Sequence, residues 1–481
     1  MVRRFLAVLS VVIGVVAMPG CVAAAIATPA PDPTPGAPGI GDPYFLLDGN
    51  GGYDVESYLL DVTYAPAADL LTGVAEVRAR ATQALSAFNL DLSGLEVRAV
   101  TVDGRPSTWT RQGGELTITP GSAVDADATF ATVVTYDGVP KTVQDRWGAA
   151  GFLHTDDGAL VIGQPDVAAT WFPANDHPLD TASFTFRITA PEGLEVIANG
   201  VFDGATSSNG MTTTTWRAAE PMAPYLAGMA IGEFDVRSYE QDGVRYWDAI
   251  DPDLLTQGGP PSIGEVATAS FARQPEILAF LKSVFGPYPF SAAGGIVDDV
   301  GELRFALESQ TRPIYASVFF TDGASGDRVV VHELAHQWFG DSLPVERWRD
   351  TWLNEGFATY AEWLWSEREG LGTSQELFDR TASIPASDPF WALTIGDPGP
   401  GAILDKAVYD RGAMTLHALR GAIGEEAFFR LLTEWPTRQA GENVTTEEFV
   451  ALAEEVSGQQ LDGLFTTWLA TPTKPTGLPG T

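Results

Sequence analysis

Cysteine is almost absent from this chain of 481 residues, because Cys21 is the only one. A single thiol excludes an intramolecular disulfide, and it also excludes a zinc site built from several thiolates. Histidine is scarce as well, with five residues in the whole sequence. Any close pair of histidines against so poor a background therefore carries information about function.

Basic residues are also few, since 28 Lys and Arg stand against 63 Asp and Glu and give a formal net charge of -35. So acidic a chain repels phosphate backbones, and no nucleic-acid partner is expected. Disorder over most of the length is excluded as well, because 45% of the residues are hydrophobic and 10% are aromatic. The length is typical of two or three domains.

The amino terminus carries an apolar run, residues 5–18, that is shorter than the roughly 20 residues needed to span a bilayer. Two arginines precede it, so residues 1–27 are predicted to be a signal peptide region and the protein is expected to be exported. Two routes stay open. Cys21 follows a glycine as in bacterial lipoprotein signals, which predicts its lipidation and anchoring to the outer face of the cell membrane. Alternatively, cleavage after Ala27 releases a soluble extracellular protein.

Two proline-rich stretches are predicted to lie outside the folded domains, residues 28–43 as an extended tether and residues 471–481 as a flexible tail. Residues 44–240 show short runs of alternating apolar and polar residues separated by turn signals, which is typical of an all-β domain. Residues 241–470 carry apolar residues at helical spacing. The predicted fold class is α+β multidomain, an all-β domain followed by a mostly helical one. Helices are expected over residues 263–285, 329–339, 355–369, 411–423, 425–434 and 446–456.

Two of the five histidines lie four residues apart, in the run His-Glu-Leu-Ala-His from His332 to His336. On a helix, positions i and i+4 share a face, so both imidazoles can bind one metal ion. Glu333 lies beside that ion without being forced to bind it, which suits a general base. The alternative is an amphipathic helix with two histidines facing solvent. The pair predicts one zinc ion per chain.

A catalytic zinc ion takes three protein ligands and keeps an open fourth position. We expect the third ligand to be Glu355, which begins a second helical segment that can return against the first. The alternative for Glu355 is an exposed carboxylate favoured by the helix dipole in the first turn.

The segments that hold these residues closely resemble the gluzincin signature of the aminopeptidase N family, which includes the leukotriene hydrolases. They read His-Glu-Leu-Ala-His-Gln-Trp-Phe-Gly from His332 and Trp-Leu-Asn-Glu-Gly-Phe-Ala around Glu355. The resemblance implies that His332, His336 and Glu355 bind zinc and that Glu333 activates water. Over roughly residues 44–470 it implies a saddle-like β domain and a thermolysin-like zinc peptidase domain. It also implies a shortened form that lacks the family's C-terminal helical domain.

The same resemblance assigns four further residues. Tyr409, in the run Val-Tyr-Asp-Arg-Gly-Ala-Met, matches the tyrosine that stabilises the tetrahedral intermediate, although its own pattern suggests a packing residue. The run Phe-Ala-Leu-Glu-Ser occupies the place of the family's Gly-x-Met-Glu-Asn motif, with three of the named residues replaced. There Glu308 matches the glutamate that receives the substrate's amino group, and Ala306 is assigned to substrate contact. Gln164 falls where a substrate-contacting glutamine lies.

The predicted function is that of a monomeric zinc aminopeptidase that removes N-terminal residues from peptides. Zinc would polarise the scissile carbonyl, and Glu333 would take a proton from water and pass it to the leaving amine. Two other classes stay open: an endopeptidase or non-peptide hydrolase of the same fold, and a peptide-binding surface protein that keeps zinc without turnover.

Overall fold

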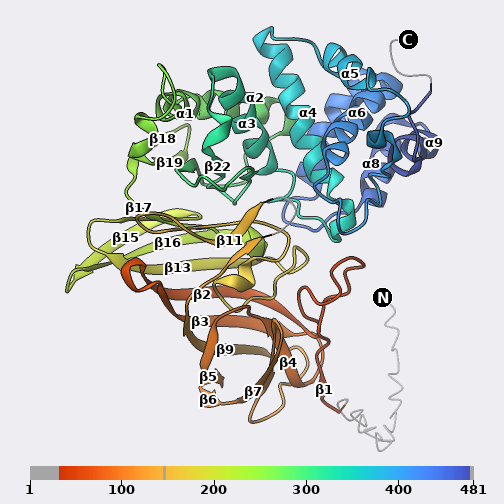
Figure 1. Ribbon diagram of the computed structural model, residues 1–481. Coiled ribbons are helices and arrows are strands. Elements are labelled where there is room, and N and C mark those ends of the chain that lie inside the picture. The colour runs from red at the N-terminus through yellow and green to blue at the C-terminus, as the bar shows by residue number, and fades with distance from the viewer. Residues whose placement is uncertain (1–31, 145–147, 477–481) are drawn as a thin grey trace, which may run out of the picture. The chain divides into compact units, whose positions relative to one another are not determined.

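The computed structural model describes residues 32–144 and 148–476. The predicted signal region and Cys21 lie outside the described residues. In the described ranges, none of the helices combines the length and the apolar character that crossing a membrane requires. Pro33 and the residues that follow it belong to one structural unit. In Figure 1 the strands of its first half run from red to yellow-green, and its helices run from green to blue.

The first half is built on an eight-stranded sheet. In its strand β2, residues alternate between buried and more exposed positions, so one face packs on the core. The pair β13–β2 is parallel, and the neighbouring pair β2–β3 is antiparallel. In spatial order the strands are β15 (Val201–Ser208), β16 (Met211–Met222), β13 (Ala182–Pro191), β2 (Tyr53–Ala65), β3 (Leu70–Ala81), β9 (Thr129–Gly138), β5 (Glu96–Val102) and β6 (Arg105–Pro106).

Two smaller sheets complete this half and confirm the predicted all-β N-terminal domain. The four-stranded sheet contains β1 (Thr34–Pro35), β4 (Leu85–Asp91), β8 (Glu115–Thr119) and β7 (Thr108–Gln112). The five-stranded sheet contains β10 (Thr142–Gln144), β11 (Ala149–His154), β12 (Ala159–Ile162), β17 (Met229–Gly232) and β14 (Glu195–Ala198). Strands β12 and β17 are buried along their whole length, so this sheet is covered on both faces.

The structure differs from the predicted tether over residues 33–43. Strand β1 pairs in parallel with β4, and Asp42 is buried. Its Oδ2 atom accepts a hydrogen bond from the backbone N–H of Trp348 at 2.9 Å and lies 3.2 Å from Nε2 of His177. The prolines correctly indicated an extended backbone. The burial of Asp42 could not be predicted, because the partners of its carboxylate lie far away in the sequence.

The first residues of the predicted tail are also attached to the fold. Nη2 of Arg411 donates to the carbonyl oxygen of Thr471 at 2.6 Å, and Nζ of Lys474 donates to that of Ile384 at 3.1 Å. The remainder of that tail, residues 477–481, lies outside the described residues.

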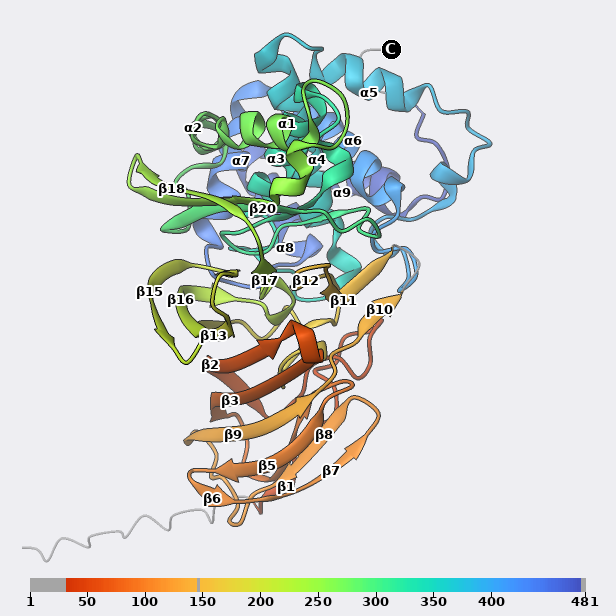
Figure 2. The same cartoon turned by 60° about the vertical axis from the view of Figure 1, so that its left-hand side comes forward.

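The second half begins with another five-stranded sheet. All residues of β20 are buried, so it lacks the alternation that reveals a strand in a sequence. Figures 1 and 2 show this sheet beside the helices α1 to α3. Its strands in spatial order are β18 (Asp235–Gln241), β19 (Val244–Ile250), β20 (Ala292–Asp298), β22 (Ile314–Ala316) and β21 (Ala306–Leu307), which places β21 at an edge.

The predicted helices are present, with shifted ends. The segment predicted over residues 263–285 is two helices, and Pro275 lies in the first turn of the second one. The helix that carries the histidines begins earlier than predicted, because the side chain of Asp322 caps it by accepting from Ser325 N–H at 2.9 Å. The helices are α1 (Ile263–Phe271), α2 (Gln274–Phe285), α3 (Gly323–His336), α4 (Trp352–Glu369), α5 (Ser374–Ala382), α6 (Lys406–Ile423), α7 (Glu425–Arg438), α8 (Thr446–Ser457) and α9 (Asp462–Phe465).

Helices α4 and α6 touch at a pair of glycines. A Cβ atom added to Gly356 would lie 2.9 Å from Cα of Gly412, so this crossing is a backbone-to-backbone contact that any larger residue would block. Gly356 directly follows Glu355, and Gly412 lies one helical turn beyond Tyr409. The close crossing therefore fixes these two side chains relative to each other.

Candidate active site

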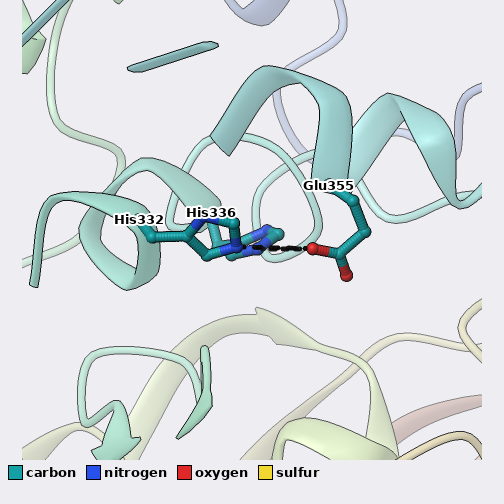
Figure 3. Close-up of side chains that lie close together, drawn as sticks. All are labelled: His332, His336 and Glu355. Carbon is teal, nitrogen blue, oxygen red and sulfur yellow. Dashed lines mark ion pairs between the residues drawn. The ribbon is translucent and has the colours of Figure 1, made fainter. Parts of the chain in front are cut away.

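The structure brings together the three predicted metal ligands. His332 and His336 lie on α3, Glu355 lies in the first turn of α4, and Figure 3 shows the carboxylate directed at the imidazoles. Oε2 of Glu355 is 3.4 Å from Nε2 of His332 and 3.3 Å from Nε2 of His336. All three side chains are buried.

The donor set fits one zinc ion. Two ligand atoms at about 2.0–2.1 Å from a tetrahedral zinc are about 3.3–3.4 Å from each other, and both measured distances have this value. Two imidazole nitrogens and one carboxylate oxygen also form the ligand set of catalytic zinc sites, which keep a fourth position open.

The far side of each imidazole has a fixed partner. Nδ1 of His332 is 2.6 Å from Oε1 of Glu362, and Nδ1 of His336 is 2.9 Å from the carbonyl oxygen of Phe339. Such acceptors place the ring proton on Nδ1 and leave Nε2 free to bind a metal. Glu362 was missed in the sequence, although it follows Glu355 by seven residues, which is two helical turns on the same face.

Carboxylates surround the two imidazoles. Ligand atoms of Glu308, Glu333 and His336 all lie within 4.8 Å of one another. Burial raises the pKa of Glu333 to about 8, and the histidines act in the opposite direction. Burial opposes the charged form of His336, but Glu355 and Glu308 raise its pKa to about 9. The negative potential at this point favours a cation, whose charge would in turn favour the ionised carboxylates.

Glu308 follows strand β21 and is fixed by two hydrogen bonds. The hydroxyl of Tyr225 donates to its Oε1 atom at 2.9 Å, and Nε2 of Gln337 donates to its backbone oxygen at 2.9 Å. Glu308 is buried, and burial is the main cause that raises its pKa. Tyr225 belongs to the β half and lies in no motif, so the sequence offered no signal for it.

Tyr409 lies at the metal site rather than in the general core. Its ring stacks on that of His332, with centroids 5.9 Å apart and an angle of 18° between the planes. Burial raises the pKa of the phenol well above its ordinary value, and the carboxylate of Glu355 adds to this shift. The hydroxyl is therefore a hydrogen-bond donor at neutral pH.

One cavity of about 600 Å³ contains the predicted site. The predicted residues that line it are Gln164, Ala306, Glu308, His332, Glu333, His336, Glu355 and Tyr409. A second cavity, of about 690 Å³, is lined by His417 and Arg420 among others, and its lining includes none of the predicted site residues. The predicted metal-binding and catalytic residues thus line the smaller of these two cavities.

Comparisons with known proteins agree with this fold and site. The model of the peptidase family M1 domain matches residues 320–468. The crystal structure of the M1 zinc metallopeptidase from Deinococcus radiodurans is 30% identical, with a TM-score of 0.81, and the match covers 92% of this chain and 99% of that one. A structure of a variant of that enzyme bound to a Tyr-Ser-Ala substrate has a TM-score of 0.80 and 28% identity, over 92% of this chain and 99% of that one. The chain therefore belongs to peptidase family M1.

The match with the curated relatives covers only part of their length. Aminopeptidase M1-C of Oryza sativa subsp. japonica is 29% identical, over 64% of this chain and 36% of its own length. Aminopeptidase N of Streptomyces lividans is 29% identical, over 66% of this chain and 38% of its own length. The match thus spans less than half of each of these two relatives.

Proposed function

We propose that the chain is a zinc-dependent aminopeptidase that removes single residues from the amino ends of peptides. The observation that carries this proposal is the position of Glu308, whose carboxylate shares one 4.8 Å cluster with Glu333 and His336. A fixed anion so close to the metal ligands suits a substrate whose cationic amino group is separated from the scissile bond by one residue. Further support comes from the relatives named aminopeptidases and from the tripeptide substrate of the Deinococcus radiodurans variant.

In the proposed reaction, each side chain has a separate role. Bound zinc supplies Lewis-acid polarisation of a carbonyl and acidification of a water molecule. The carboxylate of Glu333 accepts a proton from the attacking water and delivers it to the leaving amine. The hydroxyl of Tyr409 donates a hydrogen bond to the oxyanion that develops on the substrate carbonyl. Glu308 pairs with the free amino group, and Gln164 and Ala306 contact the substrate beside it.

An endopeptidase needs room for chain on both sides of the scissile bond. The burial of Glu308 and its hydrogen bond from Tyr225 favour a closed end and hence an exopeptidase. The test compares alanine p-nitroanilide and Ala-Ala-Ala with their N-acetylated forms. We expect acetylation to abolish cleavage and Glu308→Gln to reduce it by about 10–100-fold, as loss of a charge-assisted contact does.

The matched control is Glu302→Gln, which removes an exposed carboxylate six residues before Glu308 that does not line the cavity. It should keep wild-type activity. Efficient cleavage of acetylated peptides at internal bonds, insensitive to Glu308→Gln, would overturn the aminopeptidase proposal and favour the endopeptidase.

We further propose that the protein is exported and anchored through lipidated Cys21, and that it acts as a monomer on peptides outside the cell. The support is the basic start, the short apolar run and the position of the sole cysteine. Cys21→Ser should move activity from the membrane fraction into the medium. Wild-type protein that is already soluble and begins near Thr28 would contradict the lipid anchor.

A further inference from the structure

The cavity that contains the metal ligands is also lined by three basic residues, Arg304, Arg328 and Lys406. The lining also holds five carboxylates, so the cavity combines both signs of charge; they belong to Glu308, Glu333, Glu355, Glu362 and Asp410. Lys406 pairs with Asp410 one turn further along α6, which compensates its charge. Arg304 and Arg328 are the cations that a bound molecule can reach.

Neither arginine has a close carboxylate partner. Nη1 of Arg304 donates to the carbonyl oxygen of Leu303 at 2.9 Å, and no ion pair of Arg304 occurs within residues 32–144 and 148–476. Nε of Arg328 is 3.8 Å from Oε2 of Glu362, too far for a hydrogen bond, and its side chain is 65% exposed. Nη1 of Arg304 also donates to the carbonyl oxygen of Gly301 at 2.5 Å, so Arg304 has its remaining N–H groups for a carboxylate, whereas Arg328 can present a pair of donors.

Helix α3 sets the position of Arg328 relative to the metal site. Arg328, His332 and His336 are spaced by four residues and share one face of the helix. Glu308, the proposed partner of the amino group, is clustered with His336, at the end of this row away from Arg328. From residue 336 to residue 328 the helix rises about 12 Å, so the metal ligands lie between an anion and a cation.

Arg304 lies two residues before the edge strand β21. Residues 304, 305, 306 and 308 all line the cavity. At about 3.3 Å per residue, Arg304 is about 13 Å along the chain from Glu308. The backbone therefore rises about 12 Å from His336 to Arg328 and extends up to about 13 Å from Glu308 to Arg304.

We infer that the cleft selects peptides with a carboxylate on the leaving-group side of the scissile bond, held by Arg304 and Arg328. This inference rests on the proposed aminopeptidase function and names its substrate class. A tripeptide or tetrapeptide spans about 10–13 Å when extended, so its amino group can pair with Glu308 while its carboxylate meets the arginines. The carboxylate is either the C-terminal one of a short peptide or an acidic side chain at the third residue.

The test measures kcat/KM for release of the first alanine from paired peptides. Ala-Ala-Ala against its C-terminal amide reports on the terminal carboxylate, and Ala-Ala-Asp amide against Ala-Ala-Asn amide reports on an acidic side chain. For two partly exposed ion pairs we expect the charged member of at least one pair to be cleaved about 5- to 10-fold more efficiently. The preference should shrink in 1 M NaCl, where screening acts over about 3 Å.

The double variant Arg304→Ala/Arg328→Ala should bring the ratio within each peptide pair close to one. The matched control is Arg245→Ala, because Arg245 is 64% exposed and lies 3.8 Å from Glu240, like Arg328 and its glutamate, but lines a different cavity. It should keep the wild-type ratio. Zinc content and circular dichroism of all variants check that the site and the fold are intact.

Equal efficiency within both peptide pairs, or a preference that survives the double variant, would overturn the inference and leave the aminopeptidase proposal standing. The same peptides are also tested for binding to the zinc-loaded Glu333→Gln variant, which should bind without turnover. If no peptide is cleaved by the wild type, the proposed function fails, and the binding ratio alone then decides the inference. Equal affinity for acid and amide would overturn it.

Discussion

Glu362 holds His332 by the ring nitrogen that faces away from the metal site, with 2.6 Å between Oε1 and Nδ1. A carboxylate in this position fixes the ring and strengthens the nitrogen that binds the metal. Glu362→Gln should therefore weaken zinc binding by about 10–100-fold, measured by competition with a chromogenic chelator.

Glu369→Gln is the control for this prediction, because Glu369 ends the same helix and pairs with Arg273 at the surface. It should leave zinc affinity unchanged. Equal zinc affinity of Glu362→Gln and the wild type would show that the contact does not support the metal site.

The separate roles of ligand and base give a second prediction. Glu333→Gln should keep one zinc per chain and lower kcat by about 10²–10⁴-fold, because an amide cannot accept the proton of the attacking water. His336→Ala should lose the metal itself, since only two ligands remain. Metal analysis and steady-state kinetics on the same preparations distinguish the two. Loss of zinc from Glu333→Gln would instead make Glu333 a ligand.

Tyr409 provides the third prediction. Tyr409→Phe should lower kcat by about 10²–10³-fold, the usual cost of one lost oxyanion donor, with a smaller change in KM. Tyr246→Phe, in strand β19 outside the cleft lining, is the control and should be fully active. A Tyr409→Phe enzyme with wild-type kcat would return this residue to a packing role.

The glycine contact between α4 and α6 gives a prediction about a residue that touches no substrate. A Cβ on Gly412 would lie 2.7 Å from Cα of Gly356, so Gly412→Ala must push the helices apart. We expect a loss of about 1–3 kcal/mol of stability and a lower kcat, because Glu355 and Tyr409 separate with their helices. Thermal unfolding and kinetics measure both.

Gly259→Ala is the control for that substitution, because a Cβ there would meet no atom within 4 Å. Its stability should change little. If Gly412→Ala were as stable and active as Gly259→Ala, the crossing would tolerate a methyl group and could not be what sets the distance between the two helices.

The fifth prediction concerns pH and a buried carboxyl of the β half. Burial raises the pKa of Asp91 to about 7, although hydrogen bonds from the backbone of Asp176 and from Asn50 act the other way. A pKa above the unfolded value means that the stabilisation is complete below about pH 4 and is lost as the pH rises through about 7. The melting temperature should therefore fall between about pH 4 and pH 7, and the contribution of Asp91 should level off above pH 7.

Asp91→Asn removes this titration and keeps the acceptor oxygen. Between about pH 4 and pH 7, a single such group makes stability fall by up to about 1.4 kcal/mol per pH unit, and the variant should lack this part of the slope. Melting curves of Asp91→Asn that run parallel to the wild type across this window would show that Asp91 is not responsible.

The sequence predicted the zinc ligands because a helix turns four-residue spacing into proximity, which is a local rule. Glu308 and Tyr409 were reached through resemblance, since their own surroundings did not separate them from packing residues. Tyr225 could not be predicted at all, because it reaches Glu308 through tertiary packing of the β half on the catalytic half. Strand β20 was missed for another reason: a strand buried on both faces has no alternation.

The burial of Asp42 decides where a recombinant version of this protein can safely begin. A version that starts at residue 44, where the resemblance starts, would lack the acceptor for the N–H of Trp348 and the partner of His177. A buried donor left without its acceptor costs about 1–3 kcal/mol. Such a trimmed protein should keep its metal ligands yet precipitate or be digested at lower temperature than one that retains residues 33–43.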